Sequence, residues 1–567
     1  MGLNAILATA GQSLELFSAG IEVAGQNVAN ANTPGYVRET LNVAPSLPYE
    51  NNGLLIGTGA RGTGVRQQID LFLESQIHRA SADLSASRAR QAIYSDLETQ
   101  LNELSDLDLS TALNDFLAAL QDVANQPESV PLRQLAIQEG ASLARDIRTL
   151  SDRVNDLRSS QSRKVELLVQ EANDLIDQIR DLNSQIVRLE SSGLNRSDAG
   201  ALRTQRYQAL NRLSEILAIR ATEREGGNVD VFVGNTYLIL GGSVQRLEVV
   251  WETDRDMGVA NVRLDQTKVN PATGGGELYG VIEGRDTVLG GFLDQLNAYA
   301  ANLIFEFNRI HASGQGVRPF SSLTSEARVA DTTARLNQAG LTFTPSHGSF
   351  ELKIINESSG VTETAVINVD LDGLGGDDTT LEDLRDQINA ASGGRITATI
   401  TSDRRLKLDA ATGYQFAFAN DTSGVLAALG LNVFFSGSDA RNVSVSDSVA
   451  ADHELFATGQ GGGPADNRNV LQLAQFTDNP INSLSGMTLD QYYEAMVANV
   501  AQASASESAL ADGFDGFRES LLSQREQFSG VSLDEEAILI LKLQQAYQAA
   551  ARVVRTVDEL FDVLVTM

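Results

Sequence analysis

The hydrophobic residues at the two ends of this chain follow the same spacing. Near the N-terminus they recur in steps of mostly three and four residues, at Leu3, Leu7, Ala10, Leu14, Phe17, Ile21, Ala24, Val28 and Ala31. Near the C-terminus the same steps place Ile540, Leu543, Tyr547, Ala550, Val554, Val557, Phe561 and Leu564. Such heptad spacing keeps one face of a helix against a partner helix. We therefore expect a helix at each end of the chain and expect the two to meet in space.

The N-terminal helix is predicted over residues 1–31, ending before Asn32-Thr33-Pro34-Gly35-Tyr36. Pro34 disfavours helical backbone at Thr33 and has no N–H to donate, and Gly35 can turn the chain. Three glycines interrupt the helix, at Gly11, Gly20 and Gly25. Each costs about 1 kcal/mol relative to alanine in an exposed helix, so the helix depends on packing against a partner. Turns and a small β element are expected over residues 53–65.

Between the ends, helical and strand-like patterns alternate. Residues 71–217 are helical in composition, and residues 150–189 predict a long bundle or coiled-coil helix that ends at Ser191-Ser192-Gly193. Pro127 and Pro131 mark a break upstream of it. Strands are then expected at residues 229–233 and 237–240, with a hairpin turn between them, and helix is expected again from residue 280 to about residue 311.

A second, larger insert follows the returning helix. Strands are predicted at residues 350–355, 364–369, 396–401, 406–409 and 415–419. One helix is predicted over residues 381–391, with Thr380 as its N-cap. The glycines at 459–463, followed by Pro464, indicate a linker. From Leu471 we expect helix to the end of the chain, with a turn at Ser529-Gly530 and a capping box at Ser532-Leu533-Asp534-Glu535.

These elements predict an α+β, multidomain protein with discontinuous, nested domains. A terminal helical coiled-coil pair, the axial core, combines residues 1–70 with 525–567. A helical bundle domain combines residues 71–220 with 275–311 and 465–524. Residues 221–274 form a small β insert, residues 312–450 form an outer α+β insert, and residues 451–464 form the linker.

The composition removes several classes of function. The chain has 567 residues, with 43 Lys and Arg against 74 Asp and Glu, for a net charge of -31. Such acidity repels nucleic acid and anionic lipid surfaces. The absence of cysteine excludes disulfides, thiolate nucleophiles and cysteine-ligated zinc. No apolar run is long enough to span a membrane. Before Arg38 the only charges are Glu15 and Glu22, so we expect no cleaved secretory leader.

The motifs of catalytic and cofactor sites are missing. The four histidines lack zinc-site spacing, and the triplets at 274–276 and 461–463 lack the Lys-Ser/Thr of a phosphate loop. Asp370-Leu371-Asp372-Gly373 and Asp377-Asp378 are similar to calcium loops, but Leu381 stands where the twelfth loop position needs glutamate. No Gly-x-Ser-x-Gly motif occurs. We expect no catalytic residue, no cofactor and no metal ion.

Two terminal motifs resemble those of a known family. Asn27-Val28-Ala29-Asn30-Ala31-Asn32-Thr33-Pro34-Gly35-Tyr36 resembles the N-terminal signature of the bacterial flagellar axial proteins, which form rod, hook and hook-associated structures. Residues 529–537 and 544–549 look like the matching C-terminal signature. The stretches 202–213, with Gln205-Arg206, and 280–314 are similar to the helical region of the hook-associated members that join hook to filament. Residues 418–435 are similar to the outer insert of those members.

This resemblance implies a structural subunit of the extracellular flagellum that leaves the cell through the flagellar type III export channel. It implies self-association, contacts with the hook protein and with a second junction protein toward the filament, and an export chaperone at the C-terminal helix. The expected assembly interface lies on the terminal helices and the turn after the first. Its residues are Leu3, Leu7, Leu14, Phe17, Ile21, Val28, Asn30, Thr33, Pro34, Gly35, Tyr36, Ile540, Leu543, Tyr547, Val554, Val557, Phe561 and Leu564.

Two alternatives stay open at this point. The chain could be a surface-displayed adhesin or a hydrolase that uses flagellar ends for export, with its activity in residues 312–448. It could also be another axial subunit, such as the hook protein. The long helical stretch 71–217 argues against a hook subunit, and the missing catalytic motifs argue against a hydrolase.

Overall fold

The structure is a computed structural model that describes residues 2–33, 35–51, 54–102, 109–190, 197–224, 226–271 and 274–566. Contacts divide the chain into two compact units, each built from segments far apart in sequence. The first unit comprises Met1–Ile93, Ser159–Asp286 and Ser504–Met567. The second comprises Tyr94–Arg158 and Thr287–Ala503. Helices α2, α4 and α12 contribute residues to both units.

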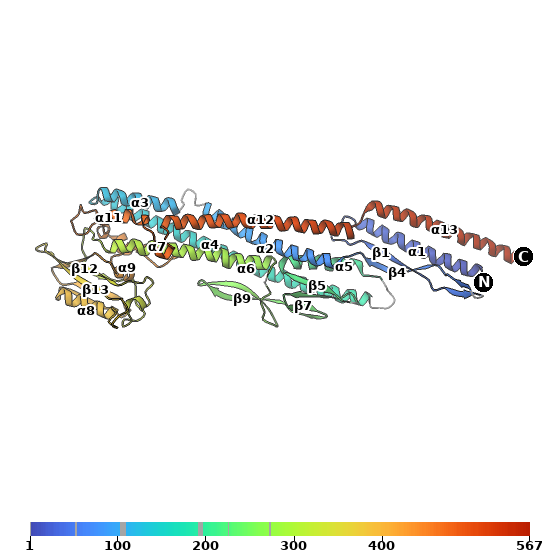
Figure 1. Ribbon diagram of the computed structural model, residues 1–567, viewed down its shortest axis with the longest axis horizontal. Helices are drawn as coiled ribbons and strands as arrows, with labels where there is room; N and C mark the ends of the chain where they lie inside the picture. Colours follow the sequence, from blue (N-terminus) through green and yellow to red (C-terminus); the bar gives the residue numbers. More distant parts are fainter. Residues whose placement is uncertain are drawn as a thin grey trace. The chain divides into compact units, whose positions relative to one another are not determined.

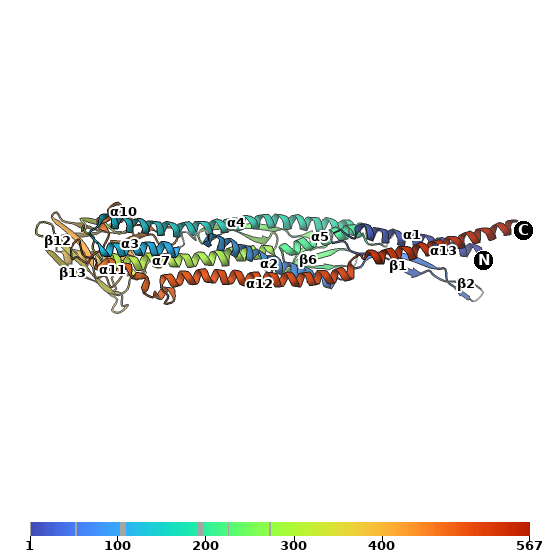
Figure 2. The same ribbon diagram turned by 90° about the horizontal axis from the view of Figure 1, so that it is seen from above.

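The chain termini form one part of the first unit. Helix α1 (Leu3–Asn30) and helix α13 (Leu533–Thr566) lie side by side in antiparallel directions (Figures 1 and 2). Strands β1 (Glu39–Pro45) and β4 (Ala60–Gln67) pair antiparallel with a bulge at Asn42/Val43, and both contact α1. Strands β2 (Tyr49–Asn51) and β3 (Leu54–Ile56) pair between them.

The rest of the first unit packs helices against β-strands. Its helices come from α2 (Leu71–Asn102), α4 (Val130–Glu190), α5 (Gly200–Ile216), α6 (Glu277–Glu283) and α12 (Leu489–Ser529). A four-stranded sheet has the order β5 (Ile219–Glu223), β6 (Val229–Val233), β7 (Thr236–Leu240), β8 (Ser243–Val244). Strands β9 (Leu247–Asp254) and β10 (Met257–Leu264) form a hairpin. Apolar side chains of α4, α5 and these strands form one core.

The second unit holds helices around an aromatic cluster. They are α3 (Leu109–Asn125), the N-terminal half of α4, α7 (Gly290–Ala312), α11 (Arg468–Ala474) and the start of α12. Short turns of helix occur at Leu336–Gln338, His453–Leu455, Phe476–Asp478 and Asn482–Leu484, and the π-helical turn η1 (Gly284–Leu289) precedes α7. Phe307 of α7 packs against Phe116, Phe434 and Phe435 with ring centroids 5.1–5.3 Å away.

The outer α+β module of this unit contains two antiparallel three-stranded sheets. One has the order β13 (Thr362–Val369), β12 (Gly348–Asn356), β16 (Tyr414–Ala419). The other has the order β11 (Ser322–Thr324), β15 (Leu406–Ala410), β14 (Ile396–Ile400). Helix α8 (Leu381–Ser392) joins their core, and the short elements α9 (Val425–Leu429), β17 (Phe435–Ser436), β18 (Ser444–Val445) and α10 (Asp447–Ala451) follow.

Most predicted elements are confirmed. The N-terminal helix, the β6–β7 hairpin, the five strands of the outer module and α8 lie within a few residues of their expected bounds. Thr380 caps α8, since its side chain accepts a hydrogen bond from the backbone N–H of Asp383 and Asp383 reciprocates. The predicted stop of the long helix at Ser191-Ser192-Gly193 and the turn residue Pro34 lie outside the described residues.

Two helix predictions were wrong in their bounds. The long helix begins at Val130 rather than Leu150, because Pro131 sits in its first turn, where a missing N–H costs nothing. Helix is not continuous after Leu471: α11 ends at Ala474 and α12 begins at Leu489, and Pro480 and the left-handed Ser485 and Gly486 lie between them. The helix predicted after the β insert is confirmed: it begins at Glu277, within three residues of its expected start, and ends at Ala312.

Among the described residues, no helix combines the length and the apolar character that crossing a membrane requires.

Candidate assembly site at the paired termini

Helices α1 and α13 come close together at Gly20. A Cβ on Gly20 would lie 2.9 Å from Cδ1 of Leu543, so the two helix backbones approach where glycine leaves room. The buried positions of α1 are Ala10, Gly20, Ala24 and Asn27. Because the last three follow one another at steps of four and three residues, the buried face of α1 has heptad spacing. It is offset by one residue from Ile21 and Val28 at its C-terminal end.

The predicted interface residues divide between this seam and the outer surface. Partly buried are Leu3, Leu14, Phe17, Ile21, Asn30, Gly35, Tyr36, Ile540, Leu543, Val554 and Phe561, while Val557 is fully buried. Exposed are Leu7, Val28, Thr33, Tyr547 and Leu564. The helices therefore use only part of their apolar surface on each other.

Asn27 connects the two ends of the N-terminal signature through hydrogen bonds. Its side chain is buried, and its Oδ1 accepts hydrogen bonds from Tyr36 Oη and from the backbone N–H of Glu39, both at 3.0 Å. Its Nδ2 donates to the carbonyl of Glu39 at 2.8 Å. Gly35 makes the turn possible with φ of 73°, which L side chains rarely adopt. Asn27 thus fixes the path from the end of α1 into strand β1.

Arg38 connects this turn to the C-terminal signature. Its backbone N–H donates to the carbonyl of Ser529 at 3.0 Å. Its guanidinium lies 3.0 Å from Glu535 and 2.7 Å from Glu536, the first-turn acids of α13. Glu535 therefore pairs with Arg38, and the backbone N–H of Glu535 lies at the hydrogen-bond limit, 3.5 Å, from Ser532 Oγ. We call Asn27, Tyr36, Arg38, Glu535 and Glu536 the terminal clasp.

Burial keeps the Tyr36 phenol of the clasp protonated. Burial, with smaller contributions from the charges of Glu39 and Glu536, raises the pKa of Tyr36 to about 12. The phenol therefore stays neutral and continues to donate to Asn27. Burial, and then the nearby charge of Asp198, raises the pKa of Glu39 above its usual range.

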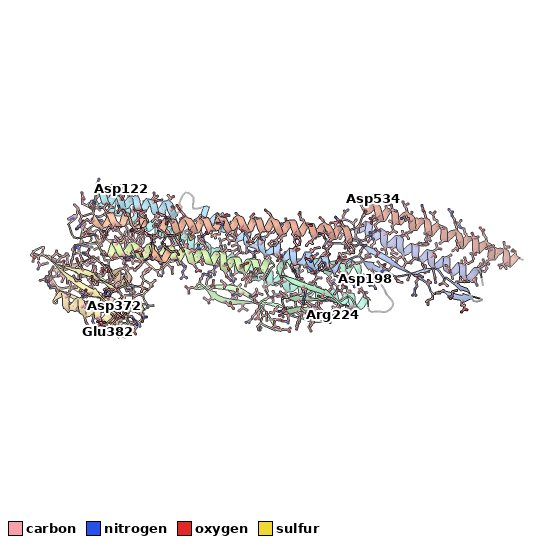
Figure 3. All side chains as sticks on the ribbon, viewed as in Figure 1. Asp122, Asp198, Arg224, Asp372, Glu382 and Asp534 are labelled. Atoms are coloured by element: carbon pink, nitrogen blue, oxygen red, sulfur yellow. The ribbon has the colours of Figure 1, made fainter. Side chains whose placement is uncertain are left out.

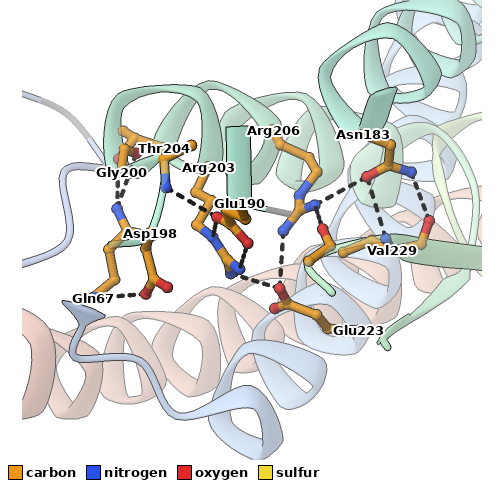
Figure 4. Close-up of polar contacts among 12 residues, drawn as sticks. Gln67, Asn183, Glu190, Asp198, Gly200, Arg203, Thr204, Arg206, Glu223 and Val229 are labelled. Atoms are coloured by element: carbon orange, nitrogen blue, oxygen red, sulfur yellow. Dashed lines mark hydrogen bonds and ion pairs between the residues drawn. The ribbon is translucent and has the colours of Figure 1, made fainter. Parts of the chain in front are cut away.

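A second polar cluster fastens β4 and the end of α4 to α5 (Figure 4). The backbone N–H of Gln67 donates to Asp198 Oδ2. The side-chain Nε2 of Gln67 donates to the Gly200 carbonyl and to Thr204 Oγ1. A Cβ on Gly200 would lie 1.5 Å from Glu39 Oε1, so a side chain at this position would displace the Glu39 carboxylate. Apolar periodicity gives no signal for this cluster, because its members are polar and come from separate elements.

The arginines of α5 complete this cluster. Arg203 lies 2.8 Å from Glu190 and 2.5 Å from Glu223. Arg206, from the Gln205-Arg206 motif, is fully buried and donates to Asn183 Oδ1 and to the Gly227 carbonyl, with Glu223 at 3.3 Å. Figure 4 shows these side chains converging between α4, α5 and strand β5. The motif therefore has a structural role in the first unit.

The acidic stretch that is similar to a calcium loop brings Asp370 and Asp372 near His347, with possible ligand atoms within 4.8 Å of one another. Figure 3 labels Asp372 on the outer module. Asp370 accepts a hydrogen bond from the backbone N–H of Asp372, and Asp372 accepts one from Leu374. The loop's own hydrogen bonds account for this arrangement.

Two family profiles match parts of the chain. The family profile described as "Flagellar hook-associated protein FlgK helical domain" matches residues 94–319. The profile "Flagellar basal body rod FlgEFG protein C-terminal" matches residues 523–567, which include α13.

Two relatives and one solved structure are similar to the chain over most of its length. The chain is 23% identical to flagellar hook-associated protein 1 of Escherichia coli (strain K12), over all of both chains. It is 24% identical to flagellar hook-associated protein 1 of Bacillus subtilis (strain 168), over 98% of this chain and 96% of that one. A structure of the flagellar hook junction protein FlgK from Burkholderia pseudomallei covers 81% of this chain and 100% of its own, with 16% identity and a TM-score of 0.49.

Paired termini locked by side chains of both signatures define a structural subunit of the flagellar axis. The full-length relatives and the helical-domain profile are more specific: over its whole length the chain is similar to flagellar hook-associated protein 1.

Proposed function

We propose that this chain joins the hook to the filament of a bacterial flagellum, and that its copies assemble through α1 and α13. The role is structural and needs no catalysis. The relatives' name, hook-associated protein 1, supports the place in the flagellum. The helical-domain profile supports this member of the axial family over the hook protein.

The observation that carries the mode of assembly is the apolar surface that the paired helices leave exposed. Large apolar side chains more than a third exposed occur on both: Ile6, Leu7, Val28, Leu533, Ile538, Leu539, Leu541, Tyr547, Val553, Leu560, Val563, Leu564 and Val565. Large exposed apolar patches are typical of interaction surfaces. Burying these side chains between copies contributes about 25 cal/mol per Å² of apolar surface removed from water, which opposes the repulsion between chains of net charge -31.

Two apolar hollows lie on this terminal element. One of about 420 Å³ is lined by Phe17, Gly20, Leu41 and Leu543, and also by the clasp residues Asn27, Arg38 and Glu536. The other, of about 820 Å³, lies beside the N-terminal half of α1. Hollows beside exposed apolar side chains on one element support mutual packing of identical copies, in which knobs of one copy fill recesses of the next.

The predicted interface residues fall into two groups with different roles in this proposal. Those of the seam, such as Phe17, Leu543 and Val557, hold a chain's own helices together. The exposed ones, such as Leu7, Tyr547 and Leu564, contact neighbouring copies, the hook protein or a second junction protein. The same exposed residues of α13 are the proposed site of an export chaperone, which covers them before the chain leaves the cell.

The test replaces exposed apolar residues of α13 without disturbing the seam. The triple variant Ile538→Ser, Leu541→Ser, Val553→Ser should fold normally but disappear from isolated flagella, with loss of filament attachment and motility. A matched control, Trp251→Ser, Val366→Ser, Leu374→Ser, replaces equally exposed residues outside the terminal element.

Immunogold labelling of wild-type flagella should give a narrow band between hook and filament. Label along the whole hook would overturn the junction assignment. Normal incorporation of the α13 triple variant would overturn assembly through the terminal helices. Deleting residues 533–567 gives an independent check, since it should abolish incorporation while the second unit stays folded.

A further inference from the structure

The sheet edge at β14, in the outer module, is closed by side chains of helix α8. Asn389 Oδ1 accepts a hydrogen bond from the backbone N–H of Ala398 at 2.8 Å, and Asn389 Nδ2 donates to the carbonyl of Ala398 at 3.0 Å. Ser392 Oγ donates to the carbonyl of Ile396 at 2.7 Å. Backbone groups of β14 that point away from β15 thus find partners on α8.

Strand β13, at the edge of the other sheet of this module, lacks such partners (Figure 1). In the β12–β13 hairpin the N–H of Asn356 donates to the carbonyl of Val361, which lies directly opposite. Hydrogen-bonded pairs alternate along an antiparallel ladder, so every second residue from Thr362 turns its N–H and C=O away from β12. The alternation holds at the far end, where both backbone groups of Asp370 bond Thr379. Across the described ranges of the chain, no hydrogen-bond partner meets the outward backbone groups of Thr362, Thr364, Val366 and Asn368.

The side chains of β13 leave this edge open to another strand. The four residues with outward backbone groups also have exposed side chains, and that of Val366 is 58% exposed. The eight-residue strand contains no proline and no lysine, which natural edge strands use to prevent pairing. Its one charged residue, Glu363, is paired with Arg395. An extended segment can therefore add to β13 through main-chain hydrogen bonds.

The charges beyond both ends of this edge are negative. Exposed Glu357 lies in the turn before β13, and exposed Asp372 and Asp377 lie in the loop after it. Pairing of the β13 edges of two copies would bring acidic ends together in either direction, and each copy carries a net charge of -31. An extended segment with a basic residue on each side of a neutral centre places a cation beside each acidic end. Charge complementarity thus favours a basic segment over a second copy.

We propose that the edge of β13 binds an extended, basic segment of a partner protein by strand addition. The main chain of that segment bonds the outward groups of β13, and its basic residues lie beside the acidic residues at the two ends. This contact goes beyond the proposed assembly, which uses the terminal helices.

Labelled peptides, followed by fluorescence anisotropy on the full-length wild-type chain, test the proposal. The probe acetyl-Lys-Thr-Val-Thr-Val-Thr-Lys-amide should bind at least tenfold more tightly than a matched peptide with Glu in place of both Lys. It should also bind at least tenfold more tightly than one with proline at the central Thr, which lacks an N–H there. Bound probe should slow hydrogen exchange of the Val366 amide at least tenfold and leave the Ala365 amide unchanged, because Ala365 faces β12. Equal binding of the three peptides would overturn the proposal.

A backbone variant removes one outward donor. Proline at position 366 removes an N–H that makes no bond to β12, and sheet edges tolerate proline. Val366→Pro should therefore lower affinity for the Lys probe at least tenfold, whereas Val366→Ser, which keeps the N–H, should stay within threefold of wild type. Unchanged affinity in folded Val366→Pro would overturn strand addition. The peptide comparison uses the wild-type chain alone, so the proposal stays falsifiable where this variant does not fold.

A charge variant tests the choice of occupant. Glu357→Gln with Asp372→Asn should weaken binding of the Lys probe at least threefold relative to Glu166→Gln with Asp174→Asn, which replaces two exposed acids on α4. Equal affinities of these two double variants would overturn the basic partner. Self-association of the wild-type chain that is lost in Val366→Pro would also overturn it, because the occupant would then be a second copy.

Discussion

The guanidinium of Arg38 lies 2.7 Å from the carboxylate of Glu536 and joins two signatures that stand at opposite ends of the chain. Glu536 is fully buried, whereas Arg38 keeps about a fifth of its side chain exposed. The ion pair therefore supplies the charge partner without which a buried carboxylate would oppose folding. It couples the turn after α1 to the first turn of α13, so that either signature alone would leave the terminal element incomplete.

Replacing Arg38 with methionine should loosen α13. The substitution keeps the length of the side chain but leaves Glu536 buried and unpaired, which costs about 3–5 kcal/mol. Amide hydrogen exchange along α13 should accelerate accordingly, while exchange in the second unit stays unchanged. The matched control is Arg61→Met on β4, where the arginine is exposed.

The double variant Arg38→Met, Glu536→Leu separates charge from packing. Because both charges are then removed, protection of α13 should return to within about 1 kcal/mol of wild type. Protection that stays as low as in Arg38→Met alone would show that the pair acts through specific hydrogen bonds and not through the uncompensated charge.

The glycines of α1 should respond differently to added side chains. A Cβ on Gly25 would meet no atom within 4 Å beyond its own helix, so Gly25→Ala should stabilise the helix by about 1 kcal/mol. At Gly20 an added side chain meets Leu543, so Gly20→Val should destabilise the α1–α13 pair by about 1–3 kcal/mol. Thermal unfolding of the terminal element, monitored by its susceptibility to proteolysis, measures the stability change of each variant.

Compensation identifies the cause at Gly20. Leu543→Ala shortens the side chain that Gly20 faces, so the double variant Gly20→Val, Leu543→Ala should be more stable than the sum of the two single changes predicts. Additive effects would contradict a direct contact between these residues.

His311 should make the second unit sensitive to acid. Its Nε2 accepts the backbone N–H of Ala457 at 3.0 Å, so Nδ1 carries the proton and donates to the Asn432 carbonyl at 2.8 Å. Burial lowers the pKa of His311 from 6.5 to about 4. The folded state thus binds fewer protons than the unfolded state, and its stability is fully present above about pH 6.5 and decreases as the pH falls toward 4. The total loss is about 3 kcal/mol.

Hydrogen exchange of the Ala457 amide measures this effect, because protonation of Nε2 breaks its hydrogen bond. His311→Gln should be less stable at neutral pH but should have a flatter dependence between pH 6.5 and 4. The probe must lie in the second unit, since His78 in the first unit also has its pKa lowered to about 4 by burial. An unchanged slope in His311→Gln would assign the acid sensitivity to other groups.

Periodicity predicted the elements well where one pattern persists over many residues. The terminal helices, the long helix of the bundle and the outer strands were all expected, because their apolar spacing reflects burial on one face. Short elements such as α9 and the interruption at residues 475–488 were missed, because a few residues carry too little pattern. The predicted seam was offset at Ile21 and Val28, because small residues mark the closest backbone approach and hydrophobicity alone does not rank Gly20 or Asn27.

The clasp residues were harder to predict than the seam. Asn27, Tyr36, Glu535 and Glu536 belong to signature stretches, but no motif or spacing assigns a partner to Arg38. Its partners lie almost 500 residues away, and a pairing over that distance follows from the fold rather than from local spacing. The only signal in the sequence was an arginine directly after the turn in an N-terminal segment otherwise free of basic residues.

Lysine should not be able to replace Arg206 of the Gln205-Arg206 motif without a loss of stability. Arg206 is fully buried and divides its donors between Asn183, the Gly227 carbonyl and Glu223, which needs the planar, forked guanidinium. Arg206→Lys keeps the charge but offers a single ammonium, so acceptors stay unpaired at a cost of about 1–3 kcal/mol each. Arg212→Lys on the same helix is the control, since that side chain is more than a third exposed in its ion pairs. Denaturant unfolding followed by the fluorescence of Trp251, the single tryptophan, reports on the first unit. Equal stability of the two variants would mean that charge alone, and not the fork geometry, holds α5 to the end of α4.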